Sequence, residues 1–138
     1  MVKVSSKDVE RFLSKICIQD DHWLFVGDGD KRYAQFKIKG SMIGVHRFAY
    51  QLWNGKIPQN LHVDHECKVT RCCNPEHLKV RTSADNNRLK HGWYQINNEW
   101  FCKKGHHQSG YNVYVKADGY SRCRECMNTY FRIRDRTR

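Results

Sequence analysis

The sequence predicts an α+β fold that has a small antiparallel sheet, two further strands followed by a helix, and a C-terminal zinc-binding module. Three observations support this prediction. Short runs of alternating apolar residues are interspersed with short amphipathic helical patterns. Two groups of Cys and His residues have the spacings of zinc ligands. The chain has only 138 residues, so metal binding would contribute directly to its folding.

The composition excludes some classes of protein and favours others. Only 39% of the residues are hydrophobic, and no run approaches the roughly 20 apolar residues of a membrane span. The N-terminus lacks the apolar segment of a secretory signal, so we expect a cytoplasmic protein whose seven Cys stay reduced. Lys and Arg number 25 against 14 Asp and Glu, and the net charge of +11 favours a polyanionic partner such as nucleic acid.

The N-terminal part of the chain has a helix pattern, a run of strand patterns and a second helix pattern. Residues 5–16 have apolar positions at i, i+3, i+4 and i+7 and are predicted to form a capped helix. Residues 23–45 are predicted to form a three-stranded antiparallel sheet, and residues 45–55 a helix that ends at a glycine. Strand alternation places four polar side chains on the outer face of this sheet: Tyr33, Gln35, Lys37 and Lys39.

Two further strands, residues 61–65 and 78–81, flank a Cys-rich loop and lead into another helix. Thr82 and Asp85 form a capping box at the start of this helix, which runs to about residue 90. Residues 97–138 have few aliphatic side chains, four candidate metal ligands and an arginine-rich end. We therefore expect two domains, residues 1–96 and residues 97–138.

The loop and its flanking elements carry residues that suit phosphodiester hydrolysis. His65 ends the first strand directly after Asp64, Asn74 precedes a proline in the loop, and Asn86 lies near the start of the helix. A neutral His is a good general base near pH 7, and carboxylate and amide oxygens are ligands for Mg²⁺. Asn87 is the alternative to Asn86 for the position on the helix.

In order and spacing, this set resembles the HNH, or ββα-metal, endonucleases, most closely the phage-type HNH branch and the His-Cys box homing endonucleases. The resemblance extends from about residue 23 to residue 88 and includes Trp23, the pair His46-Arg47 that opens a helix, and the pair Asp64-His65. It implies an enzyme, encoded by a phage or a mobile element, that hydrolyses phosphodiester bonds in double-stranded DNA. Nicking is expected of a monomer, and double-strand cleavage would need a homodimer.

The resemblance also implies a role for each site residue. His65 would activate a water, Asp64 and Asn86 would hold a single catalytic Mg²⁺, Mn²⁺ or similar divalent ion, and Asn74 would brace the loop. Strict strand alternation puts Asp64 and His65 on opposite faces, so both can serve one site only if the strand ends there. Three other functions stay open, namely a catalytically inactive zinc module that binds DNA, a zinc protein that packs against a partner, and an HNH-type RNase.

Two sets of Cys and His residues predict two structural zinc ions. Three ligands of the first set have the spacing Cys-x4-Cys-x4-His: Cys67, Cys72 and His77. A closed tetrahedral site needs a fourth ligand, which the resemblance places before the first Trp, at His22. The alternatives for this position are Cys17, Cys73 and His46. The second set combines Cys-x3-His with Cys-x2-Cys on a predicted helix: Cys102, His106, Cys123 and Cys126, with His107 as a competing ligand.

Polar and basic side chains are predicted to contact DNA. Antiparallel strands fit the major groove, where the outer face of the predicted sheet would read base edges. Phosphate contacts are expected from four arginines: Arg32, Arg47, Arg81 and Arg88. The arginine-rich end of the chain, from Arg122 onward, would contact the DNA backbone without sequence preference. A solvated sheet face and a solubilising basic end are the alternatives that involve no DNA.

Overall fold

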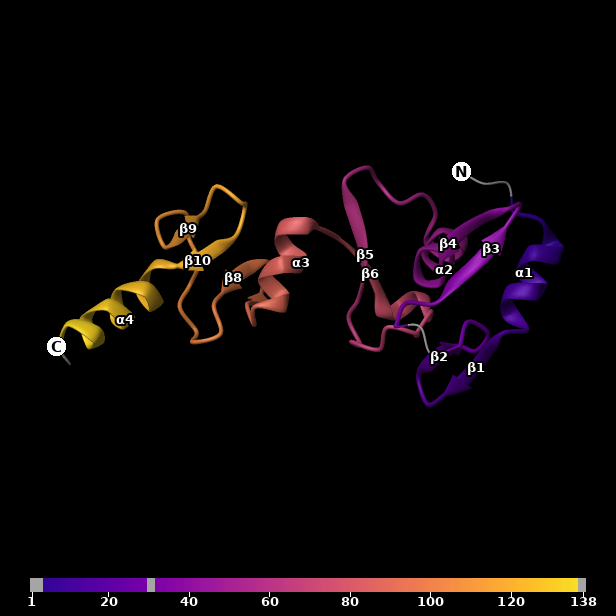
Figure 1. Cartoon of the computed structure of the whole chain (residues 1–138), viewed down its shortest axis with the longest axis horizontal. Helices are drawn as coiled ribbons and strands as arrows, with labels where there is room; N and C mark the ends of the chain where they lie inside the picture. The colour runs from indigo at the N-terminus through magenta and orange to yellow at the C-terminus, as the bar shows by residue number, and fades with distance from the viewer. Residues whose placement is uncertain (1–3, 30–31, 137–138) are drawn as a thin grey trace. The chain divides into compact units, whose positions relative to one another are not determined.

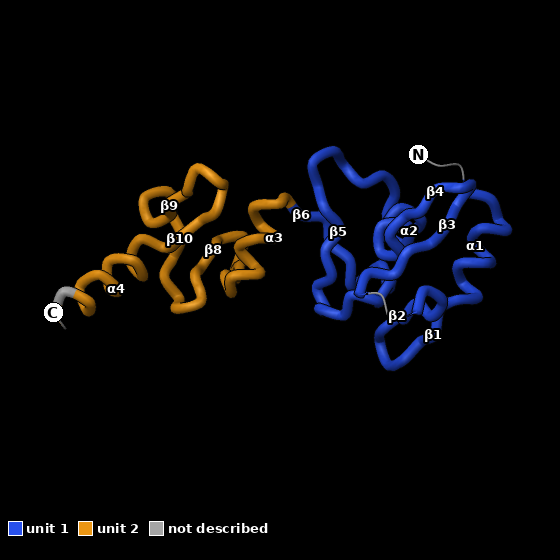
Figure 2. The backbone as a smooth tube through the Cα atoms, in the orientation of Figure 1, with its two compact units in different colours: residues 1–81 blue, residues 82–138 orange. Residues whose placement is uncertain are grey.

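The computed structural model describes residues 4–29 and 32–136, so the last two residues of the basic end lie outside the described residues (Figure 1). The chain divides into two compact units, residues 1–81 and residues 82–138 (Figure 2). This division falls before the helix of residues 83–90, whereas we expected a domain boundary after residue 96. The helix belongs with the second unit because its Arg88 guanidinium lies over the rings of Trp93 and Trp100, 5.9 and 5.4 Å from their centroids.

The described residues of the first unit form two helices, one 3₁₀ turn and six strands. In chain order they are α1 Ser6–Leu13, β1 Ile16–Gln19, β2 His22–Phe25, β3 Gln35–Ile38, β4 Ser41–Gly44, α2 Val45–Asn54, β5 Leu61–His65, η1 Pro75–His77 and β6 Leu78–Thr82. The strands form three two-stranded sheets, β1–β2, β3–β4 and β5–β6. The α+β class with small sheets is therefore confirmed.

The three-stranded sheet expected over residues 23–45 is wrong in its pairing. Strand β2 pairs with β1, in the register Ile16 opposite Phe25, while β3 pairs only with β4 among the described strands. The first helix is also shorter than expected, because it ends at Leu13 and Ile16 begins β1. The β-branched Ile16 and Ile18 of β1 favour an extended backbone. After β1, Asp20, with a φ of 52°, turns the chain back into β2.

A cluster of aromatic side chains forms the core of the first unit. Phe12 of α1 is fully buried, with ring centroids 5.8 Å from Phe25, 5.4 Å from Phe36 and 4.8 Å from Phe48. These partners come from β2, β3 and α2, so one ring joins four elements. Gly55 ends α2 with a φ of 85°, a conformation that an L side chain rarely adopts. Val63 of β5 belongs to the same cluster, so the core also holds the strand that ends at His65.

The second unit contains α3 Ser83–Lys90, β7 Tyr94–Ile96, β8 Glu99–Phe101, β9 Val113–Val115, β10 Ser121–Cys123 and α4 Arg124–Arg136. The predicted cap of α3 forms, since the Thr82 hydroxyl accepts a hydrogen bond of 3.1 Å from the Asp85 backbone N–H. The buried residues of its core are Trp93, Cys102 and Cys123. Aliphatic side chains contribute little to this core, as the sequence predicted.

Within the described ranges, no helix is both long enough and apolar enough to span a bilayer.

Replacing Phe12 by Ala is expected to lower the free energy of unfolding by about 3–5 kcal/mol, because the cavity would open between four packed elements. Urea denaturation followed by tryptophan fluorescence measures this change. Ile18→Ala is the matched control, since the Ile18 side chain is 65% exposed, and it should change stability by less than about 0.5 kcal/mol. A loss below about 1 kcal/mol for Phe12→Ala would contradict the central place of this ring.

Candidate active site and metal centres

The ring of His65 is held in one tautomer by the loop that follows its strand. His65 is the last residue of β5 and is only 5% exposed. Its Nε2 lies 3.1 Å from the backbone oxygen of Cys72. A carbonyl oxygen can only accept, so Nε2 carries the proton and donates it. In the neutral ring the lone pair is therefore on Nδ1.

Burial also keeps His65 neutral. Desolvation lowers the pKa of His65 from its ordinary value, against the opposing effects of the Cys72 carbonyl and the Asp64 carboxylate. A histidine with a lowered pKa is deprotonated at pH 7 and is able to accept a proton. The ring thus has both the tautomer and the charge state of a general base.

Asp64 is the second notable group at the end of β5. Its Oδ2 is buried and has no hydrogen-bond partner, and it lies 3.5 Å from Nε of Arg81. Arg81 also donates a hydrogen bond of 2.6 Å to Glu66, so this arginine, expected at a phosphate, is engaged by two carboxylates. Strand β5 ends at His65, which is the condition for Asp64 and His65 to serve one site. A buried carboxylate oxygen without a hydrogen bond fits a cation ligand.

Two further rings accompany His65, and sequence reasoning did not assign them to its site. The ring of His46 lies 4.9 Å from that of His65, and the ring of Tyr33 lies 6.1 and 6.4 Å from His46 and His65. Burial, then electrostatic interactions with His65 and Arg47, lower the pKa of His46 to about 4. The pair His46-Arg47 at the start of α2 is the sequence feature from which the place of His46 near His65 could have been inferred.

Asn74 ties the loop to the β1–β2 hairpin. Its side chain is buried, its Nδ2 donates to the backbone oxygen of Asp21 at 2.8 Å, and its Oδ1 accepts from the Glu76 N–H at 3.0 Å. Both bonds go to the backbone, as expected of a residue that braces a loop. The second of them starts the 3₁₀ turn that brings His77 into place.

The first Cys/His cluster brings together four side chains whose ligand atoms all lie within 4.8 Å of one another: His22, Cys67, Cys72 and His77. Cys72 Sγ is 3.5 Å from His77 Nδ1, which matches the about 3.5 Å expected between S and N ligands of a tetrahedral zinc. His77 Nε2 lies 2.8 Å from the Asp21 carboxylate, the outer contact that metal-bound histidines usually make. His22 Nδ1 is buried without a hydrogen-bond partner. These donors fit a metal ion such as zinc.

The alternatives to His22 lie elsewhere in the first unit. Cys73 is fully buried, and its thiol donates to the Trp23 carbonyl, with a sulfur–oxygen distance of 3.1 Å. Burial, then the neighbouring Cys72, raises the pKa of Cys73 to about 12, so it stays a protonated thiol. Cys17 is exposed on β1, and His46 packs against His65. The structure brings only His22 to the other three residues of the cluster, among the described Cys and His side chains.

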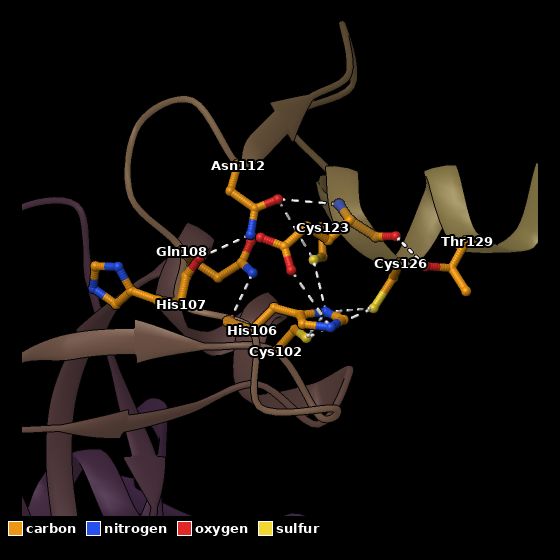
Figure 3. Close-up of polar contacts among 9 residues, drawn as sticks. Cys102, His106, His107, Gln108, Asn112, Cys123, Cys126 and Thr129 are labelled. Carbon is orange, nitrogen blue, oxygen red and sulfur yellow. Dashed lines mark hydrogen bonds and ion pairs between the residues drawn. The ribbon is translucent and has the colours of Figure 1, made fainter.

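The second Cys/His cluster lies at the start of α4 (Figure 3). Its members are Cys102, His106, Cys123 and Cys126. His106 Nδ1 is 3.5, 3.6 and 3.3 Å from the three sulfurs in that order, and the sulfurs of Cys102 and Cys126 are 3.7 Å apart. A tetrahedral zinc predicts about 3.5 Å for S to N and about 3.8 Å for S to S. The four donors therefore fit a metal ion.

Crowding of thiols within this cluster favours a cation. Although burial opposes ionisation, hydrogen bonds, first among them the one from the Cys126 backbone, lower the pKa of Cys123 to about 7. Burial and then contacts with Cys102 and Cys123 raise the pKa of Cys126 to about 12. Three thiolates cannot form side by side without a positive charge among them. Cys123 ends β10 and Cys126 is on α4, so the two do not share one helix as expected.

His107 does not compete for the second cluster. Its ring packs on Phe101, with centroids 5.2 Å apart, and its Nε2 lies 3.7 Å from Glu99. The carbonyl of His107 accepts a hydrogen bond from Asn112 Nδ2, which points toward it in Figure 3. The adjacent histidines thus have different surroundings, since His106 lies in the second cluster and His107 packs outside it.

The side chains that were predicted to read base edges are exposed on and beside β3. Strand β3 has the expected alternation, with Gln35 and Lys37 exposed and Phe36 and Ile38 buried. The other residues of the predicted outer face, Tyr33 and Lys39, are exposed as well.

The remaining candidate arginines differ in their surroundings. Arg32 lies over the Tyr33 ring, Arg47 is partly buried in the first turn of α2, and Arg88 pairs with Asp85 at 3.0 Å. Arg88 is therefore already engaged within its own unit. Contacts of all these residues with DNA stay predictions.

Asn86 and Asn87 are the fourth and fifth of the eight residues of α3, in the second unit. Asn86 is partly buried and Asn87 is exposed. Their assignment to the site of His65 stays a prediction.

Comparison with known proteins identifies the segment around His65. Residues 44–88 match the family model of the HNH endonucleases. A curated relative, Protein 7.7 of Escherichia phage T7, is 33% identical over 60 residues, which cover 44% of this chain and 46% of that protein. The match spans less than half the length of this relative. No solved structure matches the chain. Residues 44–88 are thus similar to the HNH endonucleases, which confirms over this segment the resemblance stated from the sequence.

The lowered pKa of His46 has a measurable consequence. Its ring should stay neutral from pH 8 to about pH 5 and become protonated near pH 4, whereas an ordinary histidine is half protonated near pH 6.5. Because the unfolded chain binds this proton first, His46 lowers stability as the pH falls from 6.5 toward 4, by up to about 3 kcal/mol. Ring resonances in ¹H–¹³C NMR spectra, assigned with His46→Gln, measure the titration. A midpoint near 6.5 would contradict the burial of the ring.

Proposed function

We propose that this protein is a metal-dependent HNH endonuclease that hydrolyses phosphodiester bonds in double-stranded DNA. The observation that carries the proposal is the tautomer and charge of His65. Its ring is buried and neutral, and its Nε2 donates a hydrogen bond to the Cys72 carbonyl. This ring lies in the segment that matches the HNH endonuclease family. The net charge of +11 supports a nucleic acid as the substrate.

His65 acts as the general base. Its Nδ1 takes a proton from a water molecule, and the resulting hydroxide attacks the phosphorus of the scissile bond. The bond between phosphorus and the 3′ oxygen breaks, and the leaving oxygen takes a proton from solvent water, which gives a 5′-phosphate and a 3′-hydroxyl. The Cys72 carbonyl accepts the hydrogen bond from Nε2 before and after this proton transfer. Because the carbonyl oxygen carries a partial negative charge, it stabilises the imidazolium that forms.

Asp64 and Asn86 are the proposed ligands of the catalytic ion, Mg²⁺ or a similar divalent cation such as Mn²⁺. The buried Asp64 Oδ2 without a hydrogen bond supports this role, and both residues lie within the matched segment. Bound there, the cation would supply positive charge that stabilises the pentacovalent phosphate and the leaving oxygen. Arg81 Nε lies 3.5 Å from this same oxygen, so the cation would bind Asp64 beside the guanidinium.

Zinc is the metal that we propose for both Cys/His clusters, with a structural role. Each cluster has four N and S donors, which is the composition of closed structural zinc sites. The exposed face of β3 and the candidate arginines would position the DNA. A homodimer would allow cleavage of both strands, and the similarity to a phage protein supports an intracellular location.

Cleavage of supercoiled plasmid tests the activity. Wild-type protein with Mg²⁺ at low salt should nick or linearise the plasmid, and His65→Ala should lower the rate by at least about 100-fold. The rate should also fall as the pH drops below the lowered pKa of His65, because the protonated ring cannot accept a proton. Mg²⁺ is omitted in the blank rather than chelated, since a chelator would also remove zinc.

Matched variants separate the proposed roles. His62→Ala, an exposed histidine on the same strand, should cut like the wild type. Asn86→Ala should lose activity whereas Asn87→Ala should keep it, and the reverse result would transfer the ligand role to Asn87. Cutting that persists in His65→Ala overturns the assignment of the base. Tight binding without cutting would support an inactive DNA-binding module instead, and cutting of RNA alone would support an RNase.

Metal content tests the two zinc sites. Protein purified without chelators should contain two zinc ions per chain, measured by a colorimetric chelator after unfolding. Cys72→Ser and Cys126→Ser should each lose one ion, because each removes a ligand from a different cluster. Cys17→Ser, an exposed cysteine outside both clusters, should keep both ions. Wild-type protein without bound metal would refute the assignment.

A further inference from the structure

The second unit contains a cavity that the proposed nuclease chemistry does not use. Its volume is about 330 Å³, at the lower end of the range for sites of small ligands. It lies between the β9 region and the first turns of α4 and is lined by Tyr111, Tyr114, Arg124, Met127 and Asn128. We refer to it as the tyrosine cavity.

Both tyrosine rings of this cavity are accessible to solvent, and Tyr111 is almost fully exposed. Tyr111 is 89% exposed and Tyr114 is 40% exposed, and neither belongs to the core of the second unit. The guanidinium carbon of Arg124 lies 5.8 Å from the ring centroid of Tyr111 and 5.5 Å from that of Tyr114. One positive charge is thus held beside two exposed aromatic faces.

A buried residue between the tyrosines fixes this arrangement. Asn112 is only 6% exposed, and its Oδ1 accepts a hydrogen bond of 3.0 Å from the Glu125 N–H at the start of α4 (Figure 3). Its backbone oxygen accepts from the Arg124 N–H at 2.9 Å. The backbone on both sides of Asn112 is therefore anchored next to Arg124 without help from the tyrosine rings. Packing of the unit does not explain why these two rings are present.

Charge indicates the kind of partner. Residues 82–138 contain eleven Lys and Arg against five Asp and Glu. Exposed aromatic rings interleaved with arginines on a positive unit match the way proteins bind unpaired nucleotides, whose bases stack on the rings while the phosphates contact the cations. An acidic peptide would use the charges but would not need flat aromatic faces.

We propose that the tyrosine cavity binds an unpaired nucleotide of single-stranded DNA. The base would stack on Tyr111 and Tyr114, a phosphate would contact Arg124, and the Asn128 amide would donate to or accept from the base edge. Duplex DNA presents phosphates but keeps its base faces stacked on one another, so it would engage Arg124 and leave the tyrosines unused. The inference rests on the proposed function for its choice of DNA. It adds a preference for substrates with an unpaired segment.

Fluorescence anisotropy tests the proposal on the full chain, in buffer without Mg²⁺ and without chelator. The probes are a short labelled oligothymidine, a labelled duplex of equal length and a labelled oligouridine. The double variant Tyr111→Ala, Tyr114→Ala should bind oligothymidine about tenfold more weakly than wild type and bind the duplex within about twofold of wild type. The double variant with Phe at both positions should keep the wild-type affinity, because the stacking rings remain.

Two controls make the outcome decisive. Tyr94→Ala removes a partly exposed tyrosine of the same unit that lies outside the cavity, and it should bind oligothymidine like the wild type. Zinc content shows that each variant retains the fold of its second unit. Unchanged binding in the Ala variant, an equal loss for the duplex, or tighter binding of oligouridine than oligothymidine would each overturn the proposal. Plasmid cleavage is measured separately, so failure of the nuclease and failure of this site are distinguishable.

Discussion

The candidate active site depends on one residue, Cys72, through two of its atoms. Its sulfur belongs to the first Cys/His cluster, 3.5 Å from His77 Nδ1. Its carbonyl oxygen, 3.1 Å from His65 Nε2, fixes the tautomer of the proposed base. Because both atoms belong to the same residue, a metal that holds the sulfur also holds the acceptor of the histidine. Metal binding at this cluster and the proposed action of His65 as a base would therefore be coupled through a single residue.

Contacts distant in sequence reinforce this coupling. The Cys73 N–H donates to the Trp23 carbonyl at 2.8 Å, and the Arg71 guanidinium donates to the carbonyls of Phe25 and Gly29. Strand β2 thus gives one edge to β1 and the other to the Cys-rich loop, and no edge remains for β3. The failure of the expected three-stranded sheet follows from this use of β2.

The sequence was most informative where chemistry restricts the choice of residue. Few residue types bind zinc, so spacing alone singled out Cys67, Cys72 and His77, and a resemblance supplied His22 from 45 residues earlier. Strand pairing depends on which backbone edges meet after the chain has folded, and local patterns do not record this. The ion pair of Arg81 with Asp64 was missed for the same reason, since an arginine in a basic protein is equally suited to a phosphate.

In the second unit, the Cys/His composition of the core also affects which side chains lie at the surface. Its core is built around Cys102 and Cys123, with few aliphatic side chains, so ligand bonds to a metal would replace much of the apolar burial that a unit of this size otherwise needs. A unit stabilised in this way does not have to bury its large aromatic residues. Tyr111 and Tyr114 can then remain exposed beside Arg124, where their rings are available to a ligand. A composition with few aliphatic residues and several Cys and His residues would thus account both for a metal-dependent core and for aromatic rings left at the surface.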